Sequence, residues 1–170
     1  MSSETLRTSR IQIRLSFHAY QAQSNQLIAA WSVLGGGTVM EITTSNEMGQ
    51  VPITVFHLSG SLTDEEPLIS QVTAQYESGM RYALLDLSEV GYISSSGLRA
   101  IHNVFMLLRG NDPEESDESM TKGIARGTYT SPNLKLYKPK KEAMKTLHIS
   151  GYDMFLEIYK KYKEAIASFG

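Results

Sequence analysis

The segment 81–88, "RYALLDLS", has apolar side chains at consecutive positions instead of alternate ones. A strand with one face in water alternates apolar and polar residues, whereas a strand covered on both faces does not. The segment therefore predicts a central strand with layers on both sides. The following segment, 94–110, repeats its apolar residues at the spacing of a helix. These residues are Leu98, Ile101, Val104, Phe105 and Leu108. A buried strand that leads directly into an amphipathic helix is typical of α/β proteins.

Strand and helix patterns continue to alternate from residue 38 to residue 170. Strands are predicted at 38–45, 51–60, 81–88, 133–139 and 152–159. Helices are predicted at 63–79, 94–110, 140–151 and 160–170. Thr63 or Asp64 is expected to cap the first helix. This order predicts an α/β fold, with a mixed sheet of about four to five strands, about four helices packed on it and right-handed crossovers.

Two stretches fall outside this pattern. Residues 1–37 are polar, have weak periodicity and end in three glycines, so we predict a poorly structured appendage joined by a flexible hinge to a domain at 38–170. Residues 110–133 form an insertion that is longer than ordinary structureless connections. We interpret it as a solvated loop; an acidic contact for a partner and a calcium site are the alternatives. Its acidic residues are Asp112, Glu114, Glu115, Asp117 and Glu118.

The composition argues against several classes of function. The 170 residues include no cysteine, which excludes disulfides, thiolate nucleophiles and Cys-type zinc sites and fits a reducing cytoplasm. A net charge of −2 does not favour binding to nucleic acid or to an anionic membrane. The apolar run at 27–34 is far shorter than the ~20 residues of a membrane-spanning helix. Neither membrane insertion nor a signal peptide is predicted.

Three consecutive serines, Ser94, Ser95 and Ser96, lie between the buried strand and its helix. We expect Ser94 or Ser95 to cap the helix by accepting a hydrogen bond from a free amide of the first turn. One cap needs only one serine, and three are present. The remaining hydroxyls are therefore expected at the mouth of the sheet, beside the helix N-terminus.

A serine hydrolase is the enzyme alternative. A nucleophile elbow needs a glycine two positions before the serine, and Ile93 stands there if Ser95 is the nucleophile. A triad also needs a histidine and a carboxylate, and no sequence feature brings such residues together. The candidates are His57, His102, His148 and Asp153. The four histidines, which include His18, form no i,i+4 pair, so no metal site is predicted, and no nucleotide-binding fingerprint occurs.

The segment 86–101, "DLSEVGYISSSGLRAI", resembles the signature of STAS domains, as found in bacterial anti-sigma factor antagonists. In that signature the phosphorylated serine follows an aspartate and precedes a small residue and a glycine. The segments "VFHLSGSLT" at 55–63 and "LHISGYDMFLEIY" at 147–159 resemble two further passages of the family. The resemblance covers residues 40–170 apart from the insertion.

By position, Ser95 matches the phosphorylated serine of the family, with Ser96 and Gly97 following as the signature requires. Two acids differ: Ser94 stands where the family has an aspartate, and Thr63 stands where the earlier turn has one. Ser94 thereby becomes an alternative phosphate acceptor, as does Ser96, and Asp64 lies one position from the second missing acid. The resemblance implies a partner-binding surface made of Thr63, Asp64, Ser94, Ser96, Gly97 and Leu98.

The resemblance implies a cytoplasmic signalling protein without catalytic activity, cofactor or metal of its own. In such systems the unphosphorylated protein binds an anti-sigma factor that is also a serine kinase, and so frees the sigma factor for transcription. Phosphorylation by that kinase releases the antagonist, and a metal-dependent serine phosphatase resets it. A homodimer is left open. The alternative within the same fold is a STAS subunit of a lipid-transport or stress-sensing complex.

Overall fold

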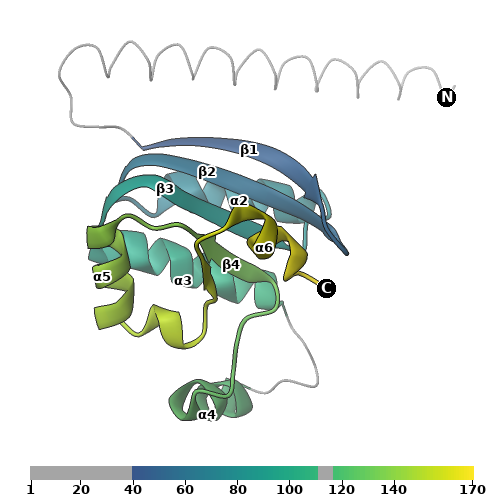
Figure 1. Ribbon diagram of the computed structural model, residues 1–170, viewed down its shortest axis with the longest axis vertical. Helices are drawn as coiled ribbons and strands as arrows, with labels where there is room; N and C mark the ends of the chain where they lie inside the picture. Colours follow the sequence, from purple (N-terminus) through teal and green to yellow (C-terminus); the bar gives the residue numbers. More distant parts are fainter. Residues whose placement is uncertain (1–39, 111–116) are drawn as a thin grey trace, which may run out of the picture. The chain divides into compact units, whose positions relative to one another are not determined.

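A computed structural model describes residues 40–110 and 117–170, and these residues form the α/β architecture that the sequence predicts (Figure 1). The strands are β1 (Glu41–Met48), β2 (Pro52–Leu62), β3 (Ala83–Ile93), β4 (Leu134–Tyr137) and β5 (Ile158–Tyr159). The helices are α2 (Glu66–Glu77), α3 (Ser95–Arg109), α4 (Asp117–Arg126), α5 (Lys141–Ile149) and α6 (Tyr162–Ala167), with a 3-10 turn, η1, at Tyr152–Met154. None of these helices is long and apolar enough to cross a membrane.

The five strands form one mixed sheet in the order β1-β2-β3-β4-β5. β1 runs antiparallel to β2, and each of the other neighbouring pairs is parallel. In the parallel pair β2 and β3, Leu62 lies opposite Ile93. Because parallel strands end at the same edge of a sheet, the residues that follow Leu62 and Ile93 are brought together there.

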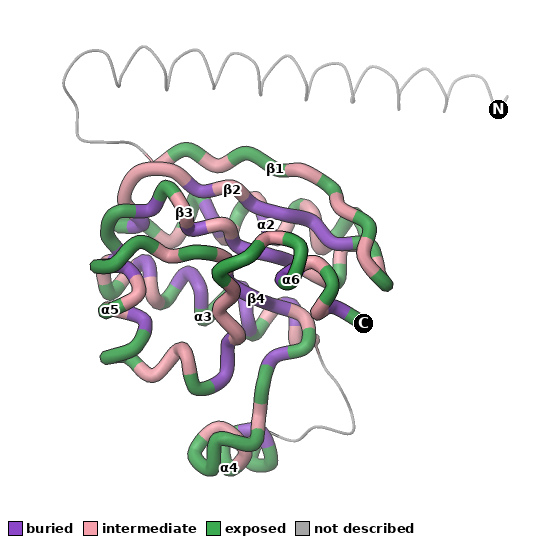
Figure 2. Tube along the Cα trace, viewed as in Figure 1, coloured by how far each residue is buried: buried purple, intermediate pink, exposed green. Residues whose placement is uncertain are grey.

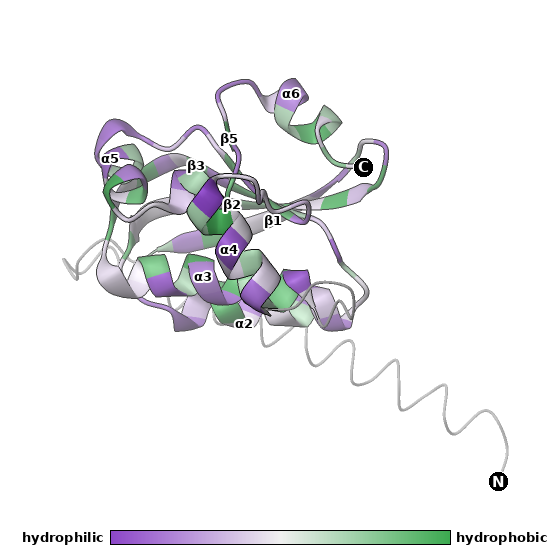
Figure 3. Cartoon of the chain, turned by 90° about the horizontal axis from the view of Figure 1, so that it is seen from below, coloured by the Kyte–Doolittle hydropathy of each residue, from purple (hydrophilic) through white to green (hydrophobic). Residues whose placement is uncertain are grey.

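The two faces of the sheet are covered by different helices (Figure 3). Phe56 of β2 and Leu85 of β3 belong to the larger core, which α2, α3 and α5 complete. Val55 and Leu84, on the opposite face, pack with Phe169 and α6 in a smaller core. Figure 2 shows the buried positions running along the central strands. Burial of each large apolar side chain contributes about 1.5–3 kcal/mol, so covering both faces is what stabilises the sheet.

The structure confirms the fold class and corrects several boundaries. β3 continues to Ile93, five residues beyond the predicted end, because its last residues still pair with β2. The predicted cap of α2 is wrong. The N-cap position is Glu65, no side chain caps the helix, and Thr63 and Asp64 both lie exposed before it.

The predicted strand at 152–159 is mostly not a strand. Gly151 has a φ of 74°, which turns the chain into η1, and only Ile158 and Tyr159 pair with β4. The apolar residues between Gly151 and Ile158 pack into the larger core instead. The Phe155 ring lies against Phe105 of α3, with ring centroids 5.1 Å apart and ring planes tilted by 58°. Tertiary packing therefore overrides a local pattern that favours a strand.

The insertion at 110–133 contains a helix, α4, that the sequence did not lead us to expect. Met120 is buried against the larger core, and Lys122 pairs with Glu118 one turn earlier at 2.6 Å. Asp112, Glu114 and Glu115 lie outside the described residues. Residues 1–37 also lie outside them, so the division of the chain into an appendage and a domain stays a prediction.

The C-terminal helix is attached to β1 through Tyr162, whose hydroxyl donates to Glu47 Oε1 at 3.1 Å. Burial, together with this carboxylate, raises the pKa of Tyr162 from 10.0 to about 12. A raised pKa means that folding favours the protonated phenol. The stabilisation is complete below pH 10 and is lost as the pH rises through about 12.

We expect the free energy of unfolding to fall more steeply between pH 10 and pH 12 in the wild type than in Tyr162→Phe, as measured by urea denaturation. Equal slopes would contradict the assignment.

Candidate functional site

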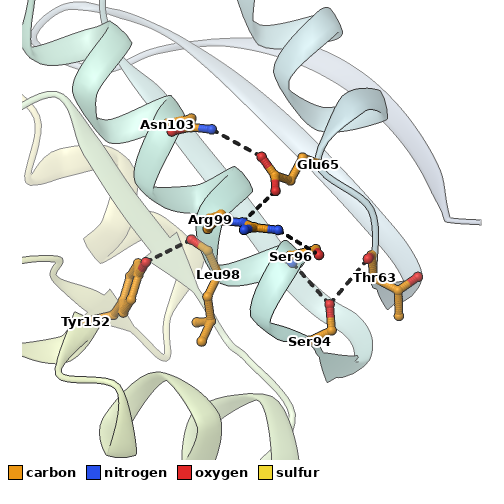
Figure 4. A network of polar contacts seen from close by, with 9 residues as sticks. Thr63, Glu65, Ser94, Ser96, Leu98, Arg99, Asn103 and Tyr152 are labelled. Carbon is orange, nitrogen blue, oxygen red and sulfur yellow. Dashed lines mark hydrogen bonds and ion pairs between the residues drawn. The ribbon is translucent and has the colours of Figure 1, made fainter.

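The three serines lie where β2 and β3 end side by side, in the turn that starts α3. Figure 4 shows Ser94 and Ser96 of this turn. The backbone amide of Ser94 donates to the carbonyl of Leu62 at 3.0 Å, which extends the pairing of the two strands by one residue. The amide of Leu98 then donates to the carbonyl of Ser94 at 2.9 Å and closes the first helical turn. The sheet therefore fixes the position at which α3 begins.

Ser94 is the N-cap of α3, which resolves the choice between Ser94 and Ser95. Its backbone is extended, and its Oγ accepts a hydrogen bond from the amide of Gly97 at 3.2 Å. The same hydroxyl donates to the carbonyl of Thr63 at 3.3 Å and so joins the ends of β2 and β3. Aspartate and serine are about equally good at an N-cap, so Ser94 caps the helix as well as an aspartate there would, and it adds a donated hydrogen bond.

Gly97 allows α3 to lie against the end of β2. A methyl group at its Cα would come within 2.1 Å of the carbonyl oxygen of Leu62, and Gly97 itself is buried. A side chain at this position would force the helix away from the strand. The glycine of the signature thus has a steric role, and it keeps the serine turn close to the strand ends.

Ser96 belongs to a polar network that links α3 to the start of α2 (Figure 4). Its Oγ accepts a hydrogen bond from Arg99 at 3.3 Å, and Arg99 Nε lies 2.7 Å from Glu65 Oε1. Asn103 donates to the other oxygen of Glu65 at 3.4 Å. The Arg99 side chain is 68% exposed, so this ion pair contributes at most about 1 kcal/mol to stability. Its main effect is to hold Ser96 and Glu65 in place beside the helix N-terminus.

Ser95 differs from both of its neighbours. It is the first residue of α3 and is exposed, whereas Ser94 and Ser96 are half-buried. Within the part of the chain that the structure describes, the hydrogen bonds of this turn involve the hydroxyls of Ser94 and Ser96, not that of Ser95. Ser95 therefore offers its hydroxyl to the outside without breaking any interaction that holds the turn.

A tyrosine from the C-terminal part of the chain supports the same helical turn. The Tyr152 hydroxyl donates to the carbonyl of Leu98 at 2.9 Å. Burial raises the pKa of Tyr152, which keeps this donor protonated at neutral pH. Leu98 is half-buried and packs at the margin of the larger core. The first turn of α3 is thus held by β2 and by η1.

The structure places all the residues of the predicted partner-binding surface around this turn, but Gly97 is buried against Leu62 and is not itself part of the exposed surface. Thr63 and Asp64 are exposed at the end of β2, and Thr63 is joined to Ser94 through its carbonyl. Sequence reasoning missed Glu65, Arg99 and Tyr152. Arg99 lies three residues after Ser96, a spacing at which helical side chains meet, so that contact had a local signal. The contact between Arg99 and Glu65 had no local sequence signal.

The residues considered for a hydrolase are not assembled around Ser95. His148 Nδ1 lies 2.6 Å from Asp153 Oδ2, and this pair joins α5 to η1. His57 Nδ1 lies 2.9 Å from Asp86 Oδ2, on the strands of the sheet. Among the described residues, no cluster of three or more His, Asp or Glu side chains is arranged to hold a metal ion.

Removing the cap should destabilise the protein measurably. We expect Ser94→Ala to lower the free energy of unfolding by about 1 kcal/mol, because an amide of the first turn loses its partner. Ser95→Ala is the matched control, since its hydroxyl holds nothing in the turn, and we expect a change within about 0.5 kcal/mol. Urea denaturation of both variants tests this, and equal losses would show that the cap has been assigned to the wrong serine.

Comparison with known proteins shows the fold. No protein-family model and no curated protein matches the sequence. An anti-sigma factor antagonist from Mycobacterium paratuberculosis has a similar structure, with a TM-score of 0.54, 15% sequence identity, and coverage of 76% of this chain and 93% of that chain. The Bacillus cell fate determinant SpoIIAA in its phosphorylated form has a TM-score of 0.46 and 17% sequence identity, with coverage of 73% of this chain and 96% of that chain. A putative anti-sigma factor antagonist from Thermotoga maritima has a TM-score of 0.44 and 19% sequence identity, with coverage of 65% of this chain and 83% of that chain. The described residues, 40–110 and 117–170, therefore have the STAS fold of anti-sigma factor antagonists.

Proposed function

We propose that this chain is an anti-sigma factor antagonist whose unphosphorylated form binds an anti-sigma factor serine kinase and frees the sigma factor. Phosphorylation on Ser95 would then release the kinase. The observation that carries the proposal is the exposed Ser95, which lies at the N-terminus of α3 between two serines that have structural hydrogen bonds. The similar Mycobacterium structure, which is that of an anti-sigma factor antagonist, supports the same assignment.

Phosphorylation of Ser95 would leave the fold intact. A phosphate adds about −1.5 to −2 charges at neutral pH. At a helix N-terminus the free amides and the helix dipole favour an anion by about 0.3–1 kcal/mol. The first turn of α3 contains no acidic residue, and the Glu65 carboxylate beside it is paired with Arg99. The charge therefore has little to disturb within the protein itself.

A partner docked over the serine turn would respond very differently. Binding would cover the exposed Ser95 and take its surroundings out of water. A charge buried in an interface without a counter-ion costs several kcal/mol, and each ~1.4 kcal/mol changes the affinity tenfold. The modification thus acts on the complex and spares the fold, which is the behaviour required of a reversible switch.

The structure favours Ser95 over the two alternative acceptors. Ser94 would have to give up its hydrogen bonds with Gly97 and Thr63, and so uncap the helix, before it could accept a phosphate. Ser96 is half-buried and held by Arg99. The missing family aspartate does not weaken the turn, because Ser94 caps it. Glu65, rather than Asp64, has its carboxylate fixed beside the serines and is a further candidate contact for the kinase.

On this proposal the chain is substrate and ligand at the serine turn, not catalyst, and needs no cofactor there. Its partners are the anti-sigma serine kinase and a metal-dependent serine phosphatase, and its location is the cytoplasm. Thr63, Asp64 and Leu98 would lie under the docked kinase together with the serines, and the buried Gly97 would keep the turn close to the strand ends.

A reconstituted switch tests the proposal. The purified full chain is mixed with a complex of its cognate anti-sigma kinase and sigma factor, without ATP, and the release of sigma factor is followed by size-exclusion chromatography. We expect release with the unmodified chain and no release with the phosphorylated chain. Failure to bind the kinase, together with co-purification of a permease–ATPase complex, would instead favour a subunit of a lipid-transport system.

A further inference from the structure

Three side chains from three adjacent strands are joined in a line across the face of the sheet on which α6 packs. Ser45 Oγ of β1 lies 2.9 Å from His57 Nε2 of β2. His57 Nδ1 lies 2.9 Å from Asp86 Oδ2 of β3. The order hydroxyl, imidazole, carboxylate is that of a nucleophile, its general base and the group that orients the base. The proposed switch at Ser95 makes no use of these residues.

The sheet itself builds this line. His57 lies directly opposite Asp86 in the parallel register of β2 and β3. In the antiparallel register of β1 and β2, His57 lies opposite Thr43, and Ser45 follows two residues later on the same face. The three side chains are therefore positioned by backbone pairing, which is more rigid than a loop and gives the geometry that a catalytic group requires.

The hydrogen bonds of Asp86 define the tautomer of His57. The Asp86 side chain is 13% exposed, and its second oxygen accepts the backbone amide of Ser88 at 3.0 Å. An ionised carboxylate only accepts, so Nδ1 of His57 must be the donor in this pair. In the neutral ring, Nε2 then carries the lone pair and accepts the proton of the Ser45 hydroxyl. The His57 side chain is 38% exposed, so solvent and small molecules reach the ring.

A fourth group lies next to Ser45. The Tyr162 hydroxyl donates to Glu47 Oε1 at 3.1 Å, and Ser45 is among the groups that influence its pKa. Burial and the Glu47 carboxylate raise the pKa of Tyr162 to about 12, so the phenol stays protonated and remains a donor at neutral pH. Because the single proton of this phenol is already donated to Glu47, Tyr162 is not counted as a donor for the reacting carbonyl oxygen.

We propose that Ser45 is a base-activated nucleophile that accepts an acyl group from small activated esters. Ser45 Oγ would form a bond to the carbonyl carbon while its proton passes to His57 Nε2, and the carbonyl oxygen would take up negative charge in contact with solvent. As the carbonyl re-forms, the bond to the leaving alcohol breaks and the alcohol takes the proton from His57. The products are acyl-Ser45 and the free alcohol, and neither oxidant nor reductant is needed.

The class of substrate follows from the surroundings of Ser45. The site is a partly exposed sheet surface whose nucleophile comes from β1, at the edge of the sheet. Because no oxyanion donor is assigned among the described residues, we expect only esters with good leaving groups to react. Fluorophosphonates are the matching probes, because they react with base-activated serines and lose fluoride.

The test uses a small alkyl fluorophosphonate on the full-length folded chain, read by intact mass and by peptide mapping. We expect one label per chain on Ser45 and none with Ser45→Ala. His57→Gln keeps a polar side chain but cannot act as the base, and we expect its labelling to be at least ~100-fold slower. Thr43→Ala changes an exposed hydroxyl on the same strand and face, and it should label as the wild type does.

Two further arms complete the test. Ser95→Ala should label normally, which separates this chemistry from the proposed switch. p-Nitrophenyl acetate should leave one acetyl group on Ser45. Circular dichroism checks that each variant is folded. Labelling on another residue, or labelling of His57→Gln at the wild-type rate in a folded protein, would overturn the proposal.

Discussion

Replacing Gly97 with alanine is expected to destabilise the protein by about 1–3 kcal/mol, although alanine is the better helix former. Helix propensity alone would favour alanine by about 1 kcal/mol. The added methyl group would come within 2.1 Å of the Leu62 carbonyl oxygen, a backbone atom held by the sheet. The helix must then shift or the strand end must open, and overpacking of this kind costs about 1–3 kcal/mol. The clash should therefore determine the sign of the effect.

Urea denaturation measures the Gly97 effect, and Gly91→Ala is the matched control. Gly91 lies in β3, six residues before Gly97, and a methyl group there meets nothing within 4 Å. We expect Gly91→Ala to leave the free energy of unfolding nearly unchanged. If Gly97→Ala were as stable as the wild type, α3 could not pack on the end of β2 as closely as the structure shows.

Placing a negative charge at position 95 should weaken binding to the anti-sigma kinase by about 100-fold. Ser95→Asp mimics part of the charge of a phosphate, and several kcal/mol of uncompensated burial correspond to such a loss. Its fold should be retained, because an acid in the first turn of α3 is favoured by the helix dipole. Isothermal titration calorimetry measures the affinity, and circular dichroism checks the fold.

Ser95→Asn separates charge from size in this experiment. Asparagine has nearly the same shape as aspartate but carries no charge, so we expect it to retain binding within about tenfold of the wild type. Equal losses for the two variants would mean that position 95 is sensitive to bulk and that the electrostatic account of release is wrong.

The fold was largely predictable because its strongest signals are local. The continuous apolar run around Leu85 and the helical spacing from Leu98 to Leu108 both correspond to buried faces in the structure. The exceptions are segments whose conformation depends on distant partners. Tyr152 and Phe155 have strand-forming side chains, yet contacts with α3 hold them in a 3-10 turn and the segment after it.

The site was predictable in part. The serine cap follows from its place before an amphipathic helix, but the choice of Ser94 depends on the Thr63 carbonyl, which only the parallel pairing of β2 and β3 brings near. The line from Ser45 to Asp86 was missed for the same reason. Its members are 12 and 29 residues apart, and no local pattern gives the registers that align them.

Phosphate mapping tests the central claim most directly. The full chain is incubated with its cognate anti-sigma kinase and ATP, and the modified residue is located by peptide mass spectrometry. We expect a single phosphate on Ser95, retained in Ser96→Ala and in folded Ser94→Ala and absent from Ser95→Ala. A phosphate that persists in Ser95→Ala at the wild-type level would contradict the account, because the switch would then reside on a hydroxyl that the structure assigns to holding the helix in place.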